Sequence, residues 1–336
     1  MIITKTPFRI SFAGGGSDLQ AFYQHGQGAV LSTTINKFMY ISSHSFFDDD
    51  RIRLKYSRTE TVSNVNRLKH PIAREILKEF EIKGAIEVSS NADVPAGTGL
   101  SSSSSFTVGL LHNMHTVLGR FVTKQQLAEE ACRIEIEKLK EPIGKQDQYA
   151  VAFGGMNVIK FNPSEKVDVE PIHLKRNIYE GLQSNLLMFC IGKPRKASCI
   201  LAEQKNNLGT RKKFSVLKQM VELVWKLRFA LYNGQLETFG KILHQNWLLK
   251  KQLASKISNS RIDDIYQTAL KKGAVGGKLL GAGGGGFMLF YCEPEKQRKV
   301  RAALSCFKEL DFKFENEGSK LIYIGDEYYE PKRPNR

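Results

Sequence analysis

The chain has 336 residues, of which 41% are hydrophobic and 25% are charged, so it has the composition of an ordinary globular protein. Its formal net charge of +16 favours anionic partners, but the basic residues form no long block and are not interleaved with aromatic residues as in common RNA-binding modules. We therefore expect small phosphorylated molecules, and not nucleic acid, as partners. No apolar stretch approaches the roughly 20 residues that cross a bilayer, and patterned sequence starts at once, which favours a cytoplasmic protein without a leader or a membrane span.

The first half of the chain predicts several strands and two helices. The strands are rich in β-branched and aromatic residues and are expected at 2–12, within 29–43, at 85–89 and, as a pair around a glycine turn, within 149–161. One helix should follow the glycine- and serine-rich segment 95–105 and end at Gly119. A second should begin at Thr123, where Thr-Lys-Gln-Gln has the spacing of a capping box, and end at Pro142.

The second half predicts mainly helices. Apolar runs suited to strands occur at 186–190, 287–292 and 321–324. Helices are expected at 215–232, at 236–253, from the N-cap Ser260 to just before Gly273, and at 300–307. Helices and strands do not alternate strictly, so the pattern predicts an α+β fold whose two parts join near residues 165–185. We place the N-terminal domain at 1–175 and the C-terminal domain at 176–336.

Three glycine-rich segments stand out, at 9–18, 95–105 and 281–287. In the second segment, glycines let the backbone approach a ligand, and the helix that follows directs its free N–H groups and positive dipole end at the loop. The serine hydroxyls add hydrogen-bond donors and a candidate Mg²⁺ ligand. This pattern predicts a phosphate cradle, although it lacks the Gly-Lys-Ser/Thr ending of a Walker A loop and the GxGxxG pattern of a dinucleotide-binding turn.

All three segments resemble motifs of one kinase superfamily. Pro95-x-Gly-x-Gly-Leu-Ser-Ser-Ser is similar to the ATP-binding motif of the GHMP kinases, which include galactokinase, homoserine kinase, mevalonate kinase and phosphomevalonate kinase. Pro7-Phe-Arg9 with Gly14-Gly-Gly-Ser-Asp18 resembles their N-terminal motif, and the run 278–287 resembles their C-terminal glycine motif. The resemblance implies a two-domain fold: an N-terminal ribosomal-protein-like domain with a left-handed βαβ crossover and a C-terminal ferredoxin-like domain, with the active site between them.

The resemblance also implies catalytic residues. The run Gly-Lys-Gln-Asp147 is similar to the galactokinase segment that holds the catalytic aspartate, so Asp147 is expected to be the general base that takes the proton of the attacking hydroxyl. Arg9 is expected beside Asp147 and the γ-phosphate, where a fixed cation stabilises the transferring group. Glu135, with Glu137 as a rival, is expected to bind Mg²⁺.

Binding residues are implied in the same way. ATP is expected to bind the cradle residues Pro95, Gly97, Gly99, Leu100, Ser101, Ser102, Ser103 and Ser104. One of Ser102 and Ser103 is expected to be the second protein ligand of Mg²⁺, and we favour Ser103. The acceptor is expected to contact Asp18, Gly15, Gly16, Arg195, Lys196, Ser198, Gly283 and Gly284. Among these, Arg195, Lys196 and Ser198 suit an acceptor phosphate.

The C-terminal half is similar to the kinases that act on D-glycero-D-manno-heptose 7-phosphate and to the related fucokinase domains. This resemblance implies ATP-dependent phosphorylation of the anomeric C1 hydroxyl of a sugar, most closely that of the heptose 7-phosphate. The alternatives are a sugar 1-kinase for an unphosphorylated sugar such as L-fucose, a sugar- and ATP-binding regulator without catalysis, and, last, a nucleic-acid-binding protein. A monomer or a homodimer is expected.

Overall fold

Two β-sheets form the frame of the protein. The structure, a computed structural model, describes residues 1–48, 50–192, 200–203 and 211–325. The strands are β1 (Ile2–Ala13), β2 (Gly28–Ser45), β3 (Ile52–Lys55), β4 (Thr59–Val62), β5 (Ile86–Ala92), β6 (Met156–Phe161), β7 (Val167–Pro171), β8 (Leu186–Gly192), β9 (Gly276–Leu279), β10 (Gly286–Tyr291), β11 (Lys308–Glu309), β12 (Phe314–Glu315) and β13 (Lys320–Ile324). The larger sheet has the order β13-β1-β2-β5-β3-β4, with β6 and β12 also paired to β2 and β7 paired to β6, and the smaller has the order β11-β8-β10-β9.

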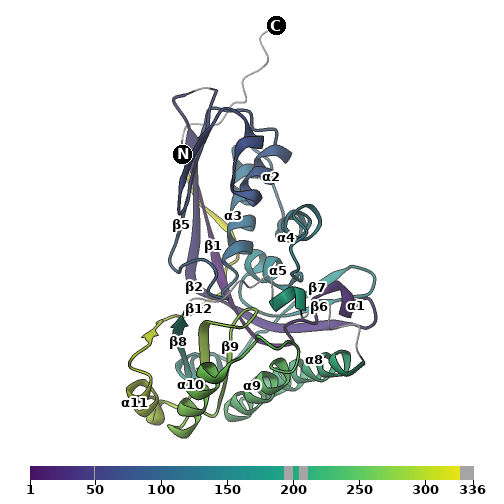
Figure 1. Ribbon diagram of the computed structural model, residues 1–336, viewed down its shortest axis with the longest axis vertical. Coiled ribbons are helices and arrows are strands. Elements are labelled where there is room, and N and C mark those ends of the chain that lie inside the picture. Colours follow the sequence, from purple (N-terminus) through teal and green to yellow (C-terminus); the bar gives the residue numbers. More distant parts are fainter. Residues whose placement is uncertain (49, 193–199, 204–210, 326–336) are drawn as a thin grey trace.

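Helices cover these sheets. They are α1 (Gln20–Tyr23), α2 (Pro71–Glu79), α3 (Ser102–Val117), α4 (Lys124–Cys132), α5 (Gln146–Phe153), α6 (Arg176–Ser184), α8 (Arg211–Tyr232), α9 (Leu236–Lys250), α10 (Ser260–Lys271) and α11 (Pro294–Ala303), with a 3₁₀ turn η1 (Val65–Arg67) and a π-helix η2 (Arg133–Lys138). In Figure 1, α2, α3 and α4 lie beside the upper part of the larger sheet, and α8 to α11 surround the lower part of the molecule. This arrangement confirms the α+β class. No helix in the described ranges is both long and apolar enough to cross a membrane.

The strand β2 is the centre of the larger sheet. It is one strand of 18 residues and not the several short runs that its sequence suggested. Its partners change along its length, with β1 on one side and β5, β6 and β12 at different points, so its backbone groups are paired over most of its course. Its first eight residues are buried, because α3, α5 and α8 pack against it. The strand can therefore hold β1 rigidly at the site described below.

The two halves of the chain share one core. Phe12 of β1 makes an edge-to-face contact with Phe239 of α9 at 5.1 Å between ring centroids and with Phe314 of β12 at 6.5 Å. Late segments also return to the larger sheet, where β13 pairs with β1 and β12 pairs with β2. The domain boundary between residues 175 and 176 stays a prediction. The pairing of β12 and β13 shows that the second half of the chain completes the larger sheet of the first half.

Residues 149–153 form the end of helix α5, so the strand predicted there is wrong. Tyr149, Val151 and Phe153 favour strands locally, but the segment packs against α3 and α4 and is largely buried, which overrides the local preference. The glycine turn is correct: Gly154 and Gly155 have positive φ and lead into β6. The helical assignment matters because it places Asp147 in the first turn of α5.

Other helix ends differ by a few residues. The Thr123 side chain caps α4 as predicted and accepts from the N–H of Gln126 at 3.1 Å. That helix leaves α geometry after Cys132 and continues as the π-helix η2. Asn259, not Ser260, caps α10 and accepts from the N–H of Ile262. The helix expected at 300–307 begins earlier, with proline in its first turn, where the missing N–H costs no hydrogen bond.

Candidate active site

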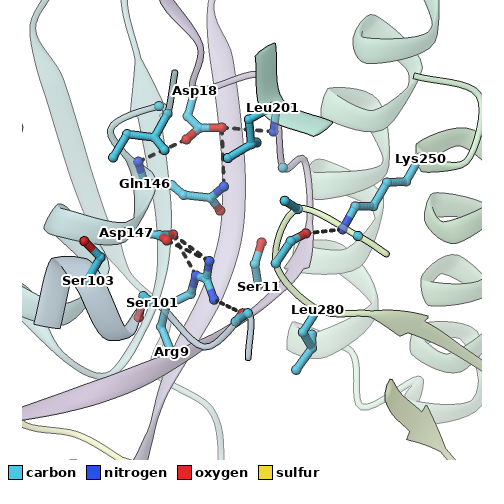
Figure 2. Close-up of a pocket in the computed structure, with 18 of the residues that line it drawn as sticks. Arg9, Ser11, Asp18, Ser101, Ser103, Gln146, Asp147, Leu201, Lys250 and Leu280 are labelled. Atoms are coloured by element: carbon cyan, nitrogen blue, oxygen red, sulfur yellow. Dashed lines mark hydrogen bonds and ion pairs between the residues drawn. The ribbon is translucent and has the colours of Figure 1, made fainter. Parts of the chain in front are cut away.

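A cavity of about 220 Å³ opens where the three glycine-rich segments meet. Its walls come from β1 and the loop after it, the loop before α3, the start of α5, the end of α9 and the loop between β9 and β10 (Figure 2). The volume is below the roughly 300–1,000 Å³ of a complete ligand site. A cavity of this size can take the acceptor together with the reacting end of a larger ligand.

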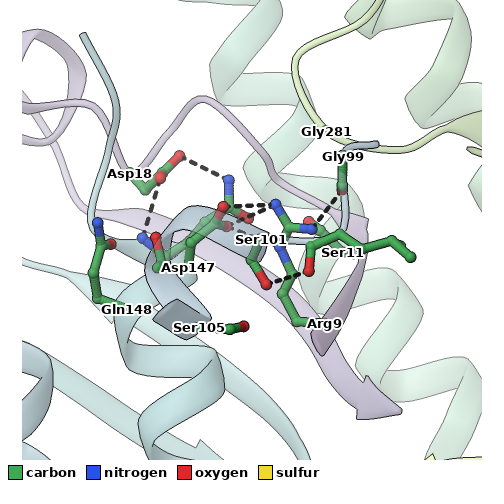
Figure 3. Close-up of polar contacts among 12 residues, drawn as sticks. Arg9, Ser11, Asp18, Gly99, Ser101, Ser105, Asp147, Gln148 and Gly281 are labelled. Carbon is green, nitrogen blue, oxygen red and sulfur yellow. Dashed lines mark hydrogen bonds and ion pairs between the residues drawn. The ribbon is translucent and has the colours of Figure 1, made fainter. Parts of the chain in front are cut away.

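The guanidinium of Arg9, on β1, binds a carboxylate of α5. It donates from Nε to Asp147 Oδ1 at 2.8 Å, from Nη2 to Oδ2 at 2.9 Å, and from Nη1 to the carbonyl of Gly99 at 2.8 Å (Figure 3). Arg9 is 3% exposed, whereas the Asp147 side chain is 25% exposed. The bidentate pair fixes the carboxylate and leaves it open to the cavity. It can therefore accept a proton from a hydroxyl bound there.

Asp18 is the second carboxylate of the cavity. It accepts from the backbone N–H of Gly16 at 2.9 Å and of Gln146 at 3.2 Å. Gly144 makes room for it, since a Cβ there would lie 2.1 Å from Asp18 Oδ2. Burial, and then the nearby charge of Asp147, raises the pKa of Asp18 to about 6. A carboxylate fixed in this way can accept hydrogen bonds from ligand hydroxyls.

The loop before α3 turns sharply. Gly97, Gly99 and Ser101 all have positive φ, and Ser101 is the N-cap residue without a capping side-chain hydrogen bond. No acidic side chain lies in the first turn of this 16-residue helix. Its first N–H groups and the positive end of its dipole thus face the cavity, which is the geometry of a phosphate site.

Two glycine-rich loops touch backbone to backbone beside this turn. A Cβ at Gly99 would lie 2.7 Å from the carbonyl oxygen of Leu280, and one at Gly281 would lie 2.4 Å from Gly99 Cα. A Cβ at Gly286 would lie 2.4 Å from the carbonyl oxygen of Thr98. Only glycine allows this approach, so the first and last thirds of the chain are held together at the cavity.

Glu135 lies behind the first turn of α3. Its carboxylate accepts from Ser103 Oγ at 2.6 Å, Ser104 Oγ at 2.9 Å and Gln148 Nε2 at 2.7 Å. It is 1% exposed, and burial raises its pKa. Ser103 lines the cavity and Glu135 does not, so the glutamate reaches the cavity only past the serine.

These donors fit ATP with Mg²⁺. The first turn of α3 offers N–H groups to phosphates, and Ser103 and Glu135 offer a hydroxyl and a carboxylate, which are hard oxygen ligands suited to Mg²⁺. Within the described ranges, no group of three or more His, Cys, Asp or Glu residues could hold a metal ion. A magnesium ion would therefore be bound by one or two side chains and by phosphate oxygens, which is its usual mode in kinases.

The predicted binding residues divide into two groups. Those that line the cavity are Gly97, Gly99, Ser101, Ser102, Ser103, Gly15, Gly16, Asp18 and Gly283. Those that do not line it are Pro95, Leu100, Ser104 and Gly284. The positions Arg195, Lys196 and Ser198 lie outside the described residues. The roles of all these residues stay predictions.

Two lysines in the cavity wall are not among the functional residues predicted from the sequence. Lys250 closes α9 and Lys278 lies in β9, and both are buried. A signal for Lys250 existed, since it follows Leu243 and Trp247 on the buried face of its helix. A lysine on the apolar face of a helix suggests a specific role, because burial of an ammonium group is unfavourable without a partner.

The chain is similar in sequence to known kinases over nearly its whole length. Residues 66–155 match the GHMP kinases N terminal domain, and residues 227–309 match the GHMP kinases C terminal domain. The chain is 32% identical to a D-glycero-alpha-D-manno-heptose 7-phosphate kinase of Campylobacter jejuni over 334 residues, which cover 95% of this chain and 98% of that one. It is 27% identical to a galactokinase of Pyrococcus furiosus, with 90% and 92% of the two chains covered.

The fold is similar to that of solved kinases. The crystal structure of a D-glycero-D-manno-heptose 1-phosphate kinase from Bacteroides thetaiotaomicron matches with a TM-score of 0.79 and 24% identity, over 97% of this chain and 100% of the other. At 24% identity the match is evidence for the fold alone, and it confirms the predicted two-domain GHMP architecture. A chain that carries both GHMP kinase domains in order, and that aligns with a heptose phosphate kinase almost from end to end, belongs to the GHMP kinase family as one of its sugar kinases.

Proposed function

We propose that the protein phosphorylates the anomeric C1 hydroxyl of D-glycero-D-manno-heptose 7-phosphate with ATP, yielding the 1,7-bisphosphate and ADP. The observation that best supports this reaction is the bidentate Arg9–Asp147 pair, which lies in the cavity wall beside the first turn of α3. The sugar follows from the 32% identity with the Campylobacter jejuni heptose 7-phosphate kinase. The cytoplasm, where ATP is available, is the proposed location.

The side chains would share the chemistry as follows. Asp147 takes the proton of the C1 hydroxyl as that oxygen attacks the γ-phosphorus and the bond to the ADP oxygen breaks. Arg9 keeps the carboxylate in position, and its charge stabilises the phosphoryl group in transfer. Asp18 accepts hydrogen bonds from sugar hydroxyls and so orients C1.

The nucleotide would approach from the opposite wall. The N–H groups of Ser102 and Ser103 at the start of α3, with the loop from Gly97, cradle its phosphates. A magnesium ion, when bound to Ser103 and Glu135, would neutralise charge on the phosphate oxygens. The close contact of Gly99 with Leu280 keeps this loop at a fixed distance from the acceptor side.

The test is coupled ADP release with Mg-ATP over a panel of D-glycero-D-manno-heptose 7-phosphate, L-fucose, galactose and mannose, with Asp147→Asn as the control. We expect turnover of the heptose phosphate that the substitution abolishes. Turnover of a free sugar alone would contradict the proposed acceptor and favour the fucokinase-like alternative. Nucleotide binding without turnover of any sugar in the panel would contradict the proposed reaction.

A further inference from the structure

Two buried ammonium groups face the cavity on the side away from α3. Lys250 Nζ donates to the carbonyl oxygens of Leu279 at 3.0 Å and Gly281 at 2.5 Å. Lys278 Nζ donates to those of Ser11 at 2.6 Å and Phe12 at 3.1 Å. The two lysines are 7% and 2% exposed, and both line the cavity. A protonated lysine has three N–H donors, so each lysine has one left after these contacts when it carries its proton.

No carboxylate forms an ion pair with either lysine in the part of the chain that the structure describes. Asp147, a carboxylate of the same cavity, is already bound by Arg9. Burial and the charge of Arg9 lower the pKa of Lys250 to about 7, and burial with the charges of Lys250 and Arg9 lowers that of Lys278 well below its usual value. Buried cations in this situation are stabilised when an anion binds beside them.

A third group on this wall lacks a partner. The hydroxyl of Ser11 is buried and has no hydrogen-bond partner among the described residues. Ser11 lines the cavity (Figure 2), and its own carbonyl oxygen accepts from Lys278 Nζ. A buried hydroxyl without a partner loses free energy unless a ligand or water binds it. Three groups that line the cavity thus have donor capacity left to offer: the two ammonium groups, beyond their carbonyl acceptors, and this hydroxyl.

We propose that Lys250, Lys278 and the Ser11 hydroxyl form the subsite that binds the phosphate group of the acceptor sugar. This inference rests on the proposed function and names residues that would recognise the phosphorylated substrate, in place of Arg195, Lys196 and Ser198, which the sequence suggested for that phosphate and which lie outside the described residues. The nucleotide phosphates already have Arg9 and the first turn of α3. Lys278 instead holds β1 just before the loop of Asp18, which is the acceptor side, and Lys250 holds the end of β9 and the loop after it in the same cavity wall. Because C1 and C7 lie at opposite ends of a heptose, a C1 hydroxyl at Asp147 requires the C7 phosphate at another wall.

The test compares Lys250→Met and Lys278→Met with wild-type enzyme in steady-state kinetics. Methionine is an unbranched side chain only one atom shorter than lysine, and it carries no charge. We expect the KM for heptose 7-phosphate to rise roughly ten- to hundred-fold, the effect of losing a charged hydrogen bond, while the KM for ATP stays within about two-fold. Lys241→Met is the matched control. Lys241 lies on the exposed face of α9, the helix of Lys250, and pairs with Glu237, so its substitution should leave both KM values unchanged.

An unchanged KM for the sugar phosphate, or a rise in the KM for ATP instead, would overturn the subsite. If the variants do not fold, inhibition of the wild-type enzyme by inorganic phosphate decides: competition with the sugar phosphate supports the subsite, and competition with ATP or no inhibition refutes it. Wild-type enzyme that uses only unphosphorylated sugars would overturn both the proposed function and the subsite. Wild-type turnover of the heptose phosphate with unaffected variants would overturn the subsite alone.

Discussion

Replacing Gly99 with alanine should slow catalysis strongly in a protein that still folds. Its φ is +86°, and a Cβ there would lie 2.7 Å from the carbonyl oxygen of Leu280, where ordinary contact begins at 3.4 Å. The loop must therefore move by about 0.7 Å, the difference between these two distances. The carbonyl of Gly99 accepts from Arg9 Nη1 at 2.8 Å, so the shift reaches the Arg9–Asp147 pair. Since a misplacement of about 1 Å costs on the order of a hundred-fold in rate, we expect kcat to fall by roughly 50- to 100-fold.

Gly119 offers the matched control for this substitution. Its φ is +63°, and a Cβ there would meet nothing within 4 Å. Gly119→Ala thus has the backbone strain of a positive φ, about 1–2 kcal/mol, without the clash. The measurements are kcat by coupled ADP release and the free energy of unfolding in urea. We expect Gly99→Ala to be destabilised at least as much as Gly119→Ala, and the large fall in kcat in Gly99→Ala alone. A kcat for Gly99→Ala within about three-fold of that of Gly119→Ala would refute the claim that the contact with Leu280 positions the catalytic pair.

Three further substitutions test the other groups of the site. Arg9→Lys keeps the charge but cannot bind Asp147 bidentately, so kcat should fall by roughly a hundred-fold in steady-state kinetics with the protein still folded. Asp18 has a folded-state pKa of about 6, above its ordinary 3.8, so its contribution to stability is present at low pH and is lost as the pH rises through 6. Asp18→Asn cannot ionise and should gain up to roughly 3 kcal/mol relative to wild type between about pH 4 and pH 7, measured by urea unfolding. Glu135→Gln should raise the Mg²⁺ concentration for half-maximal activity by about ten-fold or more, whereas the exposed rival Glu137→Gln should not.

Each of these expectations has a contrary result. Near-normal kcat in Arg9→Lys would mean that the bidentate geometry is dispensable. A stability difference for Asp18→Asn that does not grow with pH would show that this carboxyl is not the group with the raised pKa. Equal Mg²⁺ dependence in the Glu135 and Glu137 variants would remove Glu135 from the metal site.

The predictions succeeded where the local pattern and the tertiary environment agree. The apolar run 287–292 forms β10, buried throughout, and the helix after the serine run is α3. They failed at 149–153, where β-favouring residues lie in a helix buried against α3 and α4. Burial on most sides removes the alternation that distinguishes a helix from a strand, so no local signal could have corrected the assignment.

The residues of the candidate site also fall into those that the sequence predicted and those that only the structure revealed. Arg9, Gly99 and Asp147 lie in contiguous motifs that could be read from the chain, and the structure brings them into direct contact. Lys250 and Lys278 come from a helix end and a strand that meet only in the folded protein, and their importance depends on burial without a carboxylate. Burial of this kind is a property of the packing, and sequence patterns do not report it.

The return of β12 and β13 to the larger sheet has a consequence for the synthesis of the protein. The strand β1, which carries Arg9, leaves the ribosome before the other strands described here, but its residue Thr6 meets its partner Ser319 only 313 residues later. Until then one edge of β1 is open near its start, and open strand edges favour aggregation. Kinase activity should therefore appear only after β13 has been made, and nascent chains should depend on chaperones until then. Tags or truncations near β13 should reduce soluble yield more than comparable changes in exposed loops.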